Sequence, residues 1–283
     1  MTEIDGFTRV CGLIGLPVAH SLSPLLHNYA YSRLGLNYRY LAYPVQPDDL
    51  QPALRGLTAL NFSGVNVTAP HKEAVIPFID RLDPVAAATG SVNTICCREG
   101  KLEGYSTDGE GFLWSLQEEG NYVSAGKSVL LLGAGGAARA VSYALAAQGI
   151  NSLTILNRSE HRANSLAEKL QALFPSLSLK AALLTTGSVK CYLPQVSLIV
   201  NSLSGDPWPW EEMAASFYEG TLVYDLRYSL CRTGFINWAE KSGAKVLNGL
   251  GMLLAQAALS FELFTGVEPP FKLMKKVLTE VNC

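Results

Sequence analysis

The sequence predicts an α/β protein of two domains, and three observations support this prediction. Short apolar runs alternate with stretches whose apolar residues recur at helical spacing, which is the pattern of a parallel sheet covered by helices. The chain has 283 residues, of which 48% are hydrophobic, and this is enough for one large core or two medium ones. A glycine-rich turn near the middle of the chain, at 133–136, starts a second alternating series and favours two cores.

The glycine-rich turn has the spacing of a dinucleotide-binding motif. Four apolar residues, 129–132, lead directly into Gly133, Gly135 and Gly136 and then into alanine-rich helical sequence. In a G-x-G-x-x-A turn the backbone approaches a pyrophosphate at the helix N-terminus, and Ala138 is small enough for close packing of helix on strand. Such turns also occur without a ligand, so it is the position after a strand that favours a dinucleotide.

The next expected strand, 153–156, ends in residues that favour NADP over NAD. Domains that bind NAD usually have Asp or Glu here to hold the ribose 2′-hydroxyl. This chain has neutral Asn157 followed by cationic Arg158, and a cation suits a 2′-phosphate. The alternative is a solvated arginine at the start of the next helix, where its charge opposes the helix dipole.

Charge and composition exclude several classes of protein. The net charge of −2 gives no general attraction to nucleic acid or to an anionic membrane. The six cysteines form no C-x-x-C pair and no ligand pattern with the four histidines, which predicts free thiols, no metal site and a reducing compartment. Without a signal-peptide pattern or an uninterrupted apolar span, the chain is expected to be cytoplasmic.

Polar residues interrupt the expected strands of the N-terminal part. In F-S-G-V-N-V-T-A-P-H-K (62–72), Asn66 and Thr68 alternate with valines, and Lys72 follows the end of the strand. Open α/β sheets bind ligands at strand ends. A lone lysine is most often a solvated surface residue, but the polar residues before it weaken that interpretation. Another expected strand, 86–97, carries Asn93 and Thr94.

Other candidate residues lie at expected helix starts or inside a helix. Ser23 before a proline has the pattern of an N-cap, and with Ser21 it either caps and turns the chain or binds a carboxylate. Asp108 either caps the following helix or takes part in chemistry. Gln256 interrupts an apolar helical stretch, where a buried amide needs a hydrogen-bond partner in the backbone or in a ligand.

Taken together, these segments resemble the shikimate dehydrogenases, which interconvert 3-dehydroshikimate and shikimate with NADP, over essentially the whole chain. The matching motifs, in family order, are H-S-L-S-P, G-V-N-V-T-A-P-H-K, S-V-N-T, T-D-G-E-G, G-A-G-G-A-A-R-A, N-R-S and G-M-L-L-A-Q-A. The resemblance implies a role in the biosynthesis of chorismate and the aromatic amino acids. It implies a discontinuous substrate-binding and catalytic domain, 1–108 plus 249–283, which closes against an inserted Rossmann domain, 109–248.

The resemblance also implies a role for each candidate residue. Lys72 and Asp108 are the expected catalytic pair, because an ammonium can stabilise the oxygen that gains charge during hydride transfer and can supply its proton. Residues expected to hold the substrate carboxylate are Ser21, Ser23 and Tyr228, and those expected at its ring hydroxyls are Asn66, Thr68, Asn93 and Gln256. Residues expected to contact NADP are Gly133, Ala134, Gly135, Gly136, Ala137, Asn157, Arg158, Ser159 and Gly249.

The chain departs from the family's usual sequence at three positions. Ser106 stands where Asn is usual, Ser159 where Thr is usual and Leu230 where Pro is usual. Leu230 bears on the geometry of the segment that carries Tyr228, and Ser159 bears on the phosphate contact.

Three alternatives compete with a shikimate dehydrogenase. A quinate or dual quinate/shikimate dehydrogenase differs by one substrate hydroxyl, but intact N-V-T-A-P-H-K and N-R-S favour shikimate and NADP. A catalytically silent ligand sensor would need neither Lys72 nor Asp108. A methylenetetrahydrofolate dehydrogenase also pairs a lysine-bearing domain with a Rossmann domain, but the two serines and T-D-G favour a small polyol acid. Monomer and homodimer both remain open.

Overall fold

The structure is a computed structural model that describes residues 3–214, 216–228 and 232–281. It divides into two compact units: unit 1 is Met1–Gly111 with Leu253–Cys283, and unit 2 is Phe112–Met252. Helices α5 (Asp108–Glu118) and α10 (Leu250–Thr265) each contain residues of both units. Leu230, one of the three departures from the family sequence, lies outside the described residues.

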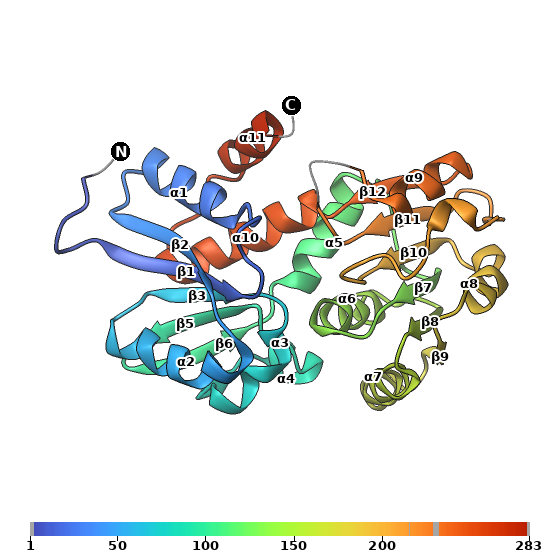
Figure 1. The fold of residues 1–283 in the computed structure, drawn as a ribbon, viewed down its shortest axis with the longest axis horizontal. Helices are drawn as coiled ribbons and strands as arrows, with labels where there is room; N and C mark the ends of the chain where they lie inside the picture. The colour runs from blue at the N-terminus through green and yellow to red at the C-terminus, as the bar shows by residue number, and fades with distance from the viewer. Residues whose placement is uncertain (1–2, 215, 229–231, 282–283) are drawn as a thin grey trace. The chain divides into compact units, whose positions relative to one another are not determined.

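Unit 1 is built on a mixed six-stranded sheet (Figure 1). Its strands, in spatial order, are β2 (Tyr38–Pro44), β1 (Arg9–Gly15), β3 (Gly64–Val67), β5 (Thr94–Arg98), β6 (Lys101–Tyr105) and β4 (Arg81–Leu82). Strand β1 is parallel to β2 and β3, whereas β5 runs antiparallel to both β3 and β6. The alternation of strands and helices predicts a parallel sheet here. This prediction is wrong for two pairs of neighbouring strands, β3 with β5 and β5 with β6.

The two faces of the unit 1 sheet are covered by different helices. The remaining helices of the unit are α1 (Ser23–Arg33), α2 (Leu50–Ala59), α3 (His71–Ala74), α4 (Pro84–Thr89) and α11 (Phe271–Val281), with 3-10 turns at Pro47–Asp49 and Ile76–Phe78. Val65 and Val67 of β3 pack in the same core cluster as Leu54 of α2. Because side chains alternate along a strand, Asn66 points to the opposite face, where its amide meets Ser260 of α10. A polar layer therefore lies between the sheet and α10.

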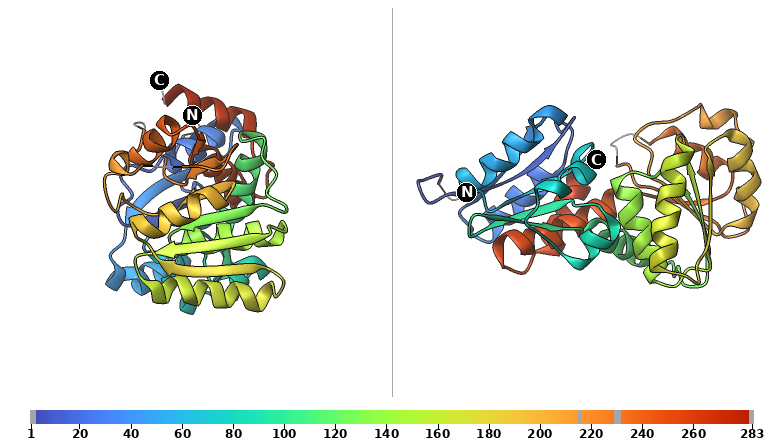
Figure 2. Two further views of the ribbon diagram at one scale, coloured as in Figure 1. Left: turned by 90° about the vertical axis from the view of Figure 1, so that its right-hand side faces the viewer. Right: turned by 90° about the horizontal axis from the view of Figure 1, so that it is seen from below.

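Unit 2 has a parallel six-stranded sheet in the order of dinucleotide-binding α/β domains. Its strands, in spatial order, are β12 (Lys245–Asn248), β11 (Leu222–Asp225), β10 (Leu198–Asn201), β7 (Ser128–Leu132), β8 (Ser152–Asn157) and β9 (Ser178–Leu183). All five neighbouring pairs are parallel, and the left view of Figure 2 shows these strands side by side. With β7 as the first strand, the order reads 3-2-1-4-5-6 from the β9 edge, which places a topological switch point beside β7.

Two apolar clusters cover the two faces of the unit 2 sheet. The helices of this unit, besides α5, are α6 (Gly136–Ala147), α7 (Glu160–Leu173), α8 (Thr186–Tyr192) and α9 (Gly234–Lys241), with 3-10 turns at Leu193–Gln195 and Trp210–Glu212. Val129 and Leu131 of β7 pack in one cluster, with residues of α5, α6 and α7. Leu130 and Leu132 pack in the other, with residues of α8 and α9. The apolar run before the glycine turn is thus a strand buried on both faces.

Two local predictions in unit 1 are wrong. Helix α1 begins at Ser23 itself, preceded by Leu22 without a side-chain capping bond, so Ser23 is not the N-cap. The first part of the strand expected within 86–97 is helix α4, because Asp83 accepts a hydrogen bond from the Ala86 backbone at 2.7 Å and Pro84 follows it at the first helical position.

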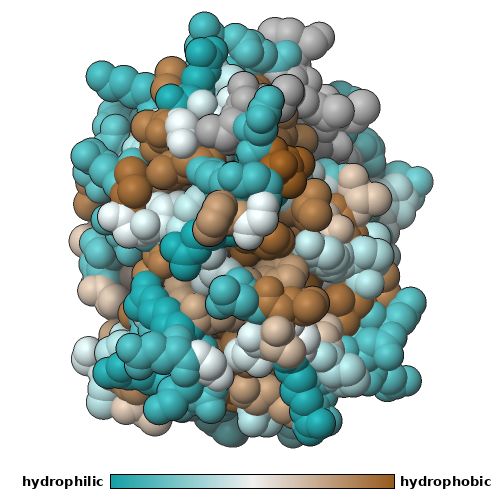
Figure 3. All heavy atoms as spheres, turned by 90° about the vertical axis from the view of Figure 1, so that its left-hand side faces the viewer, coloured by the Kyte–Doolittle hydropathy of each residue, from teal (hydrophilic) through white to brown (hydrophobic). Residues whose placement is uncertain are grey.

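No helix within 3–214, 216–228 and 232–281 is long and apolar enough to cross a membrane. On the face drawn in Figure 3, hydrophilic and hydrophobic residues are interspersed. Isolated apolar side chains, such as Phe7 and Leu60, are ordinary on folded proteins.

His27 of α1 is buried in an aromatic cluster, and this makes the stability of the fold depend on pH. Its ring stacks on Tyr40 with centroids 4.3 Å apart, and neither ring nitrogen has a hydrogen-bond partner among the described residues. Desolvation lowers the pKa of His27 to about 3. Its pKa in the unfolded chain is about 6.5, so below that pH the unfolded state binds the proton first.

We expect the free energy of unfolding to fall by about 1.4 kcal/mol for each pH unit below about 6.5, until the pH approaches 3, because of His27 alone. Urea unfolding at pH 7.5 and pH 5.0 measures the effect. His27→Phe keeps a ring on Tyr40 and should lose this part of the pH dependence. If the wild type and the variant lose equal stability between the two pH values, His27 is not the cause.

Candidate active site

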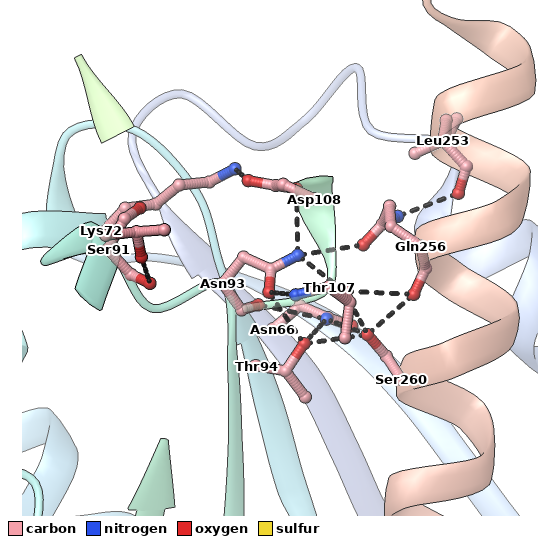
Figure 4. A network of polar contacts seen from close by, with 11 residues as sticks. Asn66, Lys72, Ser91, Asn93, Thr94, Thr107, Asp108, Leu253, Gln256 and Ser260 are labelled. Carbon is pink, nitrogen blue, oxygen red and sulfur yellow. Dashed lines mark hydrogen bonds and ion pairs between the residues drawn. The ribbon is translucent and has the colours of Figure 1, made fainter. Parts of the chain in front are cut away.

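A polar network in unit 1 brings together five of the residues singled out in the sequence (Figure 4). They come from three places in the chain: β3 and the short helix α3 that follows it, the segments on either side of the β5–β6 hairpin, and α10. The five residues are Asn66, Lys72, Asn93, Asp108 and Gln256. Their side chains are buried or nearly so, which makes each hydrogen bond among them costly to lose.

Lys72 and Asp108 form an ion pair at the edge of this network. Nζ of Lys72 donates to Oδ2 of Asp108, and the two side chains are 16% and 5% exposed. Lys72 lies on the short helix α3, whose position is set on two sides: the Lys72 carbonyl accepts from the Val92 backbone at 2.9 Å, and Nε2 of His71 lies 2.8 Å from the Val45 carbonyl oxygen. The ammonium is therefore held in place while remaining in reach of solvent.

Asn93 connects the ion pair to the rest of the network. Its Nδ2 donates to Oδ1 of Asp108 at 2.9 Å and to Oγ1 of Thr107 at 2.8 Å, and Oε1 of Gln256 lies 3.4 Å away. Its Oδ1 accepts from the Thr107 backbone at 2.8 Å. One carboxylate oxygen of Asp108 is thus held by an amide and the other by an ammonium, which fixes the carboxylate plane.

Gln256 joins the network from helix α10, and Asn66 joins it from strand β3. Nε2 of Gln256 donates to the Leu253 carbonyl of its own helix at 2.9 Å. Asn66 is 5% exposed and bonds through both ends of its amide to protein groups, among them Tyr40 and Ser260. Thr68 is half-buried just after β3, and its backbone N–H donates to the carbonyl oxygen of Ile14 at 2.9 Å.

Four residues of this network are not candidate site residues in the sequence: Tyr40, Thr94, Thr107 and Ser260. Thr94 and Thr107 stand next to candidates, in S-V-N-T and T-D-G, and adjacency is their only signal. Ser260 lies one helical turn after Gln256 on α10, so the i, i+4 spacing from a buried glutamine is a signal that points to it. Nothing in the local sequence distinguishes Tyr40 from a core tyrosine.

The two serines expected at the substrate carboxylate lie at the start of α1. Ser23 is 5% exposed, and Ser21 is half-buried two residues before it. Oγ of Ser21 accepts from the Ser23 backbone at 3.2 Å. Ser106, which departs from the family sequence, has a buried hydroxyl without a hydrogen-bond partner among the described residues.

In unit 2 the glycine turn has the backbone geometry of an anion-binding helix start. Gly133 has φ of +110°, and a Cβ there would lie 2.3 Å from Oγ of Ser202, so only glycine fits. Helix α6 starts at Gly136 with Gly135 as its cap, and its first N–H groups have no acceptor within the helix. Ala134 is buried and Ala137 half-buried beside them. These residues fit the pyrophosphate of a dinucleotide.

Strand β8 ends in a neutral amide, Asn157, which is followed by the cation Arg158. Asn157 is half-buried and donates through Nδ2 to the Ser159 carbonyl at 2.9 Å, while Arg158 and Ser159 are exposed. Ser159 caps α7 without a side-chain bond. The positions therefore fit a nucleotide with an extra phosphate better than one with a free ribose hydroxyl.

The remaining two candidates lie near the ends of β11 and β12. Tyr228 is half-buried, three residues after Asp225. Gly249 is buried, and a Cβ there would lie 2.1 Å from the carbonyl oxygen of Leu226. Backbone packing alone thus accounts for glycine at 249, and a cofactor contact there stays a prediction. No group of three or more His, Cys, Asp or Glu side chains able to hold a metal ion occurs among the described residues.

A switch-point sheet order, a glycine turn at a helix start and a separate unit with a lysine–aspartate pair define a dinucleotide-binding α/β protein of two units. Comparison with models of protein families shows which family within this class the chain matches. The chain matches a model of the shikimate dehydrogenase substrate binding domain at 13–95, one of shikimate/quinate 5-dehydrogenase at 116–197 and one of the shikimate 5′-dehydrogenase C-terminal domain at 249–279.

Individual proteins agree with the family models. The chain is 45% identical to the shikimate dehydrogenase (NADP(+)) of Moorella thermoacetica, with 99% of this chain and 96% of that protein covered. It is 35% identical to a Thermus thermophilus shikimate 5-dehydrogenase solved with NADP(H) and shikimate, with a TM-score of 0.81 and 96% and 99% of the chains covered. A Corynebacterium glutamicum quinate dehydrogenase solved with NAD is 26% identical, with a TM-score of 0.81 and 96% and 99% covered. The chain belongs to the shikimate dehydrogenase family, which confirms the resemblance seen in its motifs.

Proposed function

We propose that this protein is an NADP-dependent shikimate dehydrogenase, which reversibly reduces 3-dehydroshikimate to shikimate in the biosynthesis of chorismate and the aromatic amino acids. The observation that carries the proposal is the Lys72–Asp108 ion pair, with Asn93 bonded to the same carboxylate and Gln256 next to it. A cation, a carboxylate and amides within one network are the groups that a polyhydroxylated ring with a reducible carbonyl requires.

In the proposed mechanism, Lys72 is the acid and base. NADPH, when bound, supplies the hydride that turns the substrate carbonyl into an alcohol. The Lys72 ammonium stabilises the negative charge that develops on the substrate oxygen and then donates its proton to that oxygen. In the reverse direction the neutral amine takes the proton from the substrate hydroxyl. The hydroxyls around it in the network are neutral, so Lys72 is the cation placed for this step.

Asp108 and Asn93 orient the proton donor. Asp108 accepts from Lys72 through Oδ2 and from Asn93 through Oδ1, so the carboxylate cannot rotate away without breaking a buried hydrogen bond. We further propose that Asp108 accepts a hydrogen bond from a neighbouring substrate hydroxyl. One N–H of the Lys72 ammonium then donates to Asp108, and another is directed at the substrate oxygen.

Each remaining candidate keeps a proposed role. We assign Ser21, Ser23 and Tyr228 to the substrate carboxylate, and Asn66, Thr68, Asn93 and Gln256 to its ring hydroxyls. The residues assigned to NADP are Gly133, Ala134, Gly135, Gly136, Ala137, Asn157, Arg158, Ser159 and Gly249. We assign substrate binding and catalysis to 1–108 with 249–283 and NADP binding to 109–248, in a cytoplasmic monomer or homodimer.

An assay that follows NADPH absorbance tests the proposed function. We expect the purified protein to oxidise NADPH with 3-dehydroshikimate, and to reduce NADP with shikimate faster than it reduces NAD with quinate. Efficient NAD-dependent oxidation of quinate would instead identify a quinate dehydrogenase, which the similarity to the Corynebacterium enzyme makes the second candidate. Binding of shikimate and NADP without turnover would identify a ligand sensor.

A further inference from the structure

We propose that Tyr40 and Ser260 are positioning residues that lock the side-chain amide of Asn66 in one orientation, so that Asn66 offers the substrate a hydrogen-bond acceptor and no donor. The inference rests on the proposed function, since it concerns how the same site selects its substrate.

The nitrogen end of the Asn66 amide is fully engaged by protein acceptors. Nδ2 lies 3.1 Å from the Asn93 carbonyl oxygen, 3.0 Å from Oγ1 of Thr94 and 2.9 Å from Oγ of Ser260 (Figure 4). An amide nitrogen has two hydrogens, and three acceptors surround it. A backbone carbonyl can only accept, so a flipped amide would set two oxygens against each other. No N–H of Asn66 is left for a ligand.

Ser260 accepts from Asn66 because its own proton is used elsewhere. Its side chain is fully buried, and its hydroxyl donates to the Gln256 carbonyl one turn earlier on α10, at 2.9 Å. The lone pairs of Oγ are then left for Nδ2 of Asn66 and for the Thr94 hydroxyl, whose oxygen is 2.8 Å away. Without this hydroxyl, one N–H of Asn66 would lose an acceptor inside the protein.

Tyr40 fixes the oxygen end of the amide. Its hydroxyl donates to Oδ1 of Asn66 at 2.7 Å. The Tyr40 side chain is fully buried, and its ring lies against the His27 ring with an interplanar angle of 5°. The ring cannot swing, so the hydroxyl stays on Oδ1 and takes one of its two lone pairs.

The remaining lone pair of Oδ1 is what Asn66 can offer a substrate. It is satisfied by a hydroxyl that donates and not by an ether, a carbonyl or a C–H at the same place on the ring. Sites built around a buried polar group reject analogues that lack the matching partner far more strongly than apolar pockets reject a change of size. Asn66 would thus help to select a ring that carries a free hydroxyl at this position.

Tyr40→Phe tests the positioning role, with Tyr31→Phe as a matched control. Tyr31 belongs to the same buried cluster, but its hydroxyl faces Cys11 and bonds to none of the described residues of the network. We expect Tyr40→Phe to raise KM for shikimate about tenfold with kcat changed less than about threefold, because the loss falls on binding that ground state and transition state share. Tyr31→Phe should leave both constants within about twofold of the wild type.

A double-mutant cycle with Asn66→Ala separates positioning from a general effect on the fold. If Tyr40 acts through Asn66, Tyr40→Phe has no further effect on KM once Asn66 is alanine. Ser260→Ala is likewise expected to raise KM for shikimate when Asn66 is present and to have no further effect on KM once Asn66 is alanine. An unchanged KM in Tyr40→Phe, an equal rise in Tyr31→Phe, or additive effects in the cycle would each overturn the inference.

The wild-type protein separates this inference from the proposed function. Absence of shikimate turnover with NADP in the wild type contradicts the proposed function itself. Normal wild-type turnover together with an unaffected KM in Tyr40→Phe contradicts the positioning role alone.

Discussion

Lys72→Ala is expected to lower kcat for reduction of 3-dehydroshikimate by about 10² to 10⁴, with a much smaller change in KM. The variant loses both the cation that stabilises the developing alkoxide and the proton that neutralises it, and both act mainly in the transition state. Initial rates of NADPH oxidation, measured over a range of substrate concentrations, give the two constants separately.

Lys101→Ala on β6 is the matched control, because it removes an exposed lysine from the same unit outside the network. Lys72→Ala also leaves the Asp108 carboxylate, 5% exposed, without its cation, so thermal unfolding of both variants shows whether the fold survives. A folded Lys72→Ala protein with nearly wild-type kcat would remove Lys72 from the proposed role.

The sequence predicts the elements that carry the site better than it predicts their ends. The strand that precedes Lys72 and the strand that leads into Gly133 are recognisable because residues that do not continue a strand follow each of them, Pro70 after the first and glycines after the second. The start of α1 is misplaced by one residue, since Ser-Pro suits either the cap or the first turn. Helix α4 is not predicted because it is only six residues long and ends just before the motif S-V-N-T, which favours a strand.

The supporting contacts of the site are beyond local sequence patterns. Ser260 and Asn66 are 194 positions apart, and Tyr40 and Asn66 are 26 apart, so no periodicity relates them. A serine in an apolar helix and a tyrosine in a strand each have an ordinary structural explanation when read alone. Only the fold shows that they hold the two ends of one amide.

Arg158→Ala is expected to raise KM for NADPH by about 10- to 100-fold while leaving KM for NADH nearly unchanged. A charge-assisted hydrogen bond to a phosphate contributes about 1.5–3 kcal/mol, and only NADPH carries the 2′-phosphate. The exposed position of Arg158 at the end of β8 means that its removal leaves the core of unit 2 intact. Kinetics with both nucleotides, at a fixed saturating concentration of 3-dehydroshikimate, measure the change in preference.

Salt dependence distinguishes a direct phosphate contact from a general loss of positive charge. If Arg158 meets the 2′-phosphate, raising the ionic strength should weaken NADPH binding in the wild type more than in Arg158→Ala, because screening acts on the pair that the variant lacks. Lys169→Ala removes one exposed cation farther along α7 and should leave the nucleotide preference unchanged. An equal rise in KM for NADPH and for NADH in Arg158→Ala would instead place the arginine at a part that the two nucleotides share. The preference for NADP would then come from other residues of the chain.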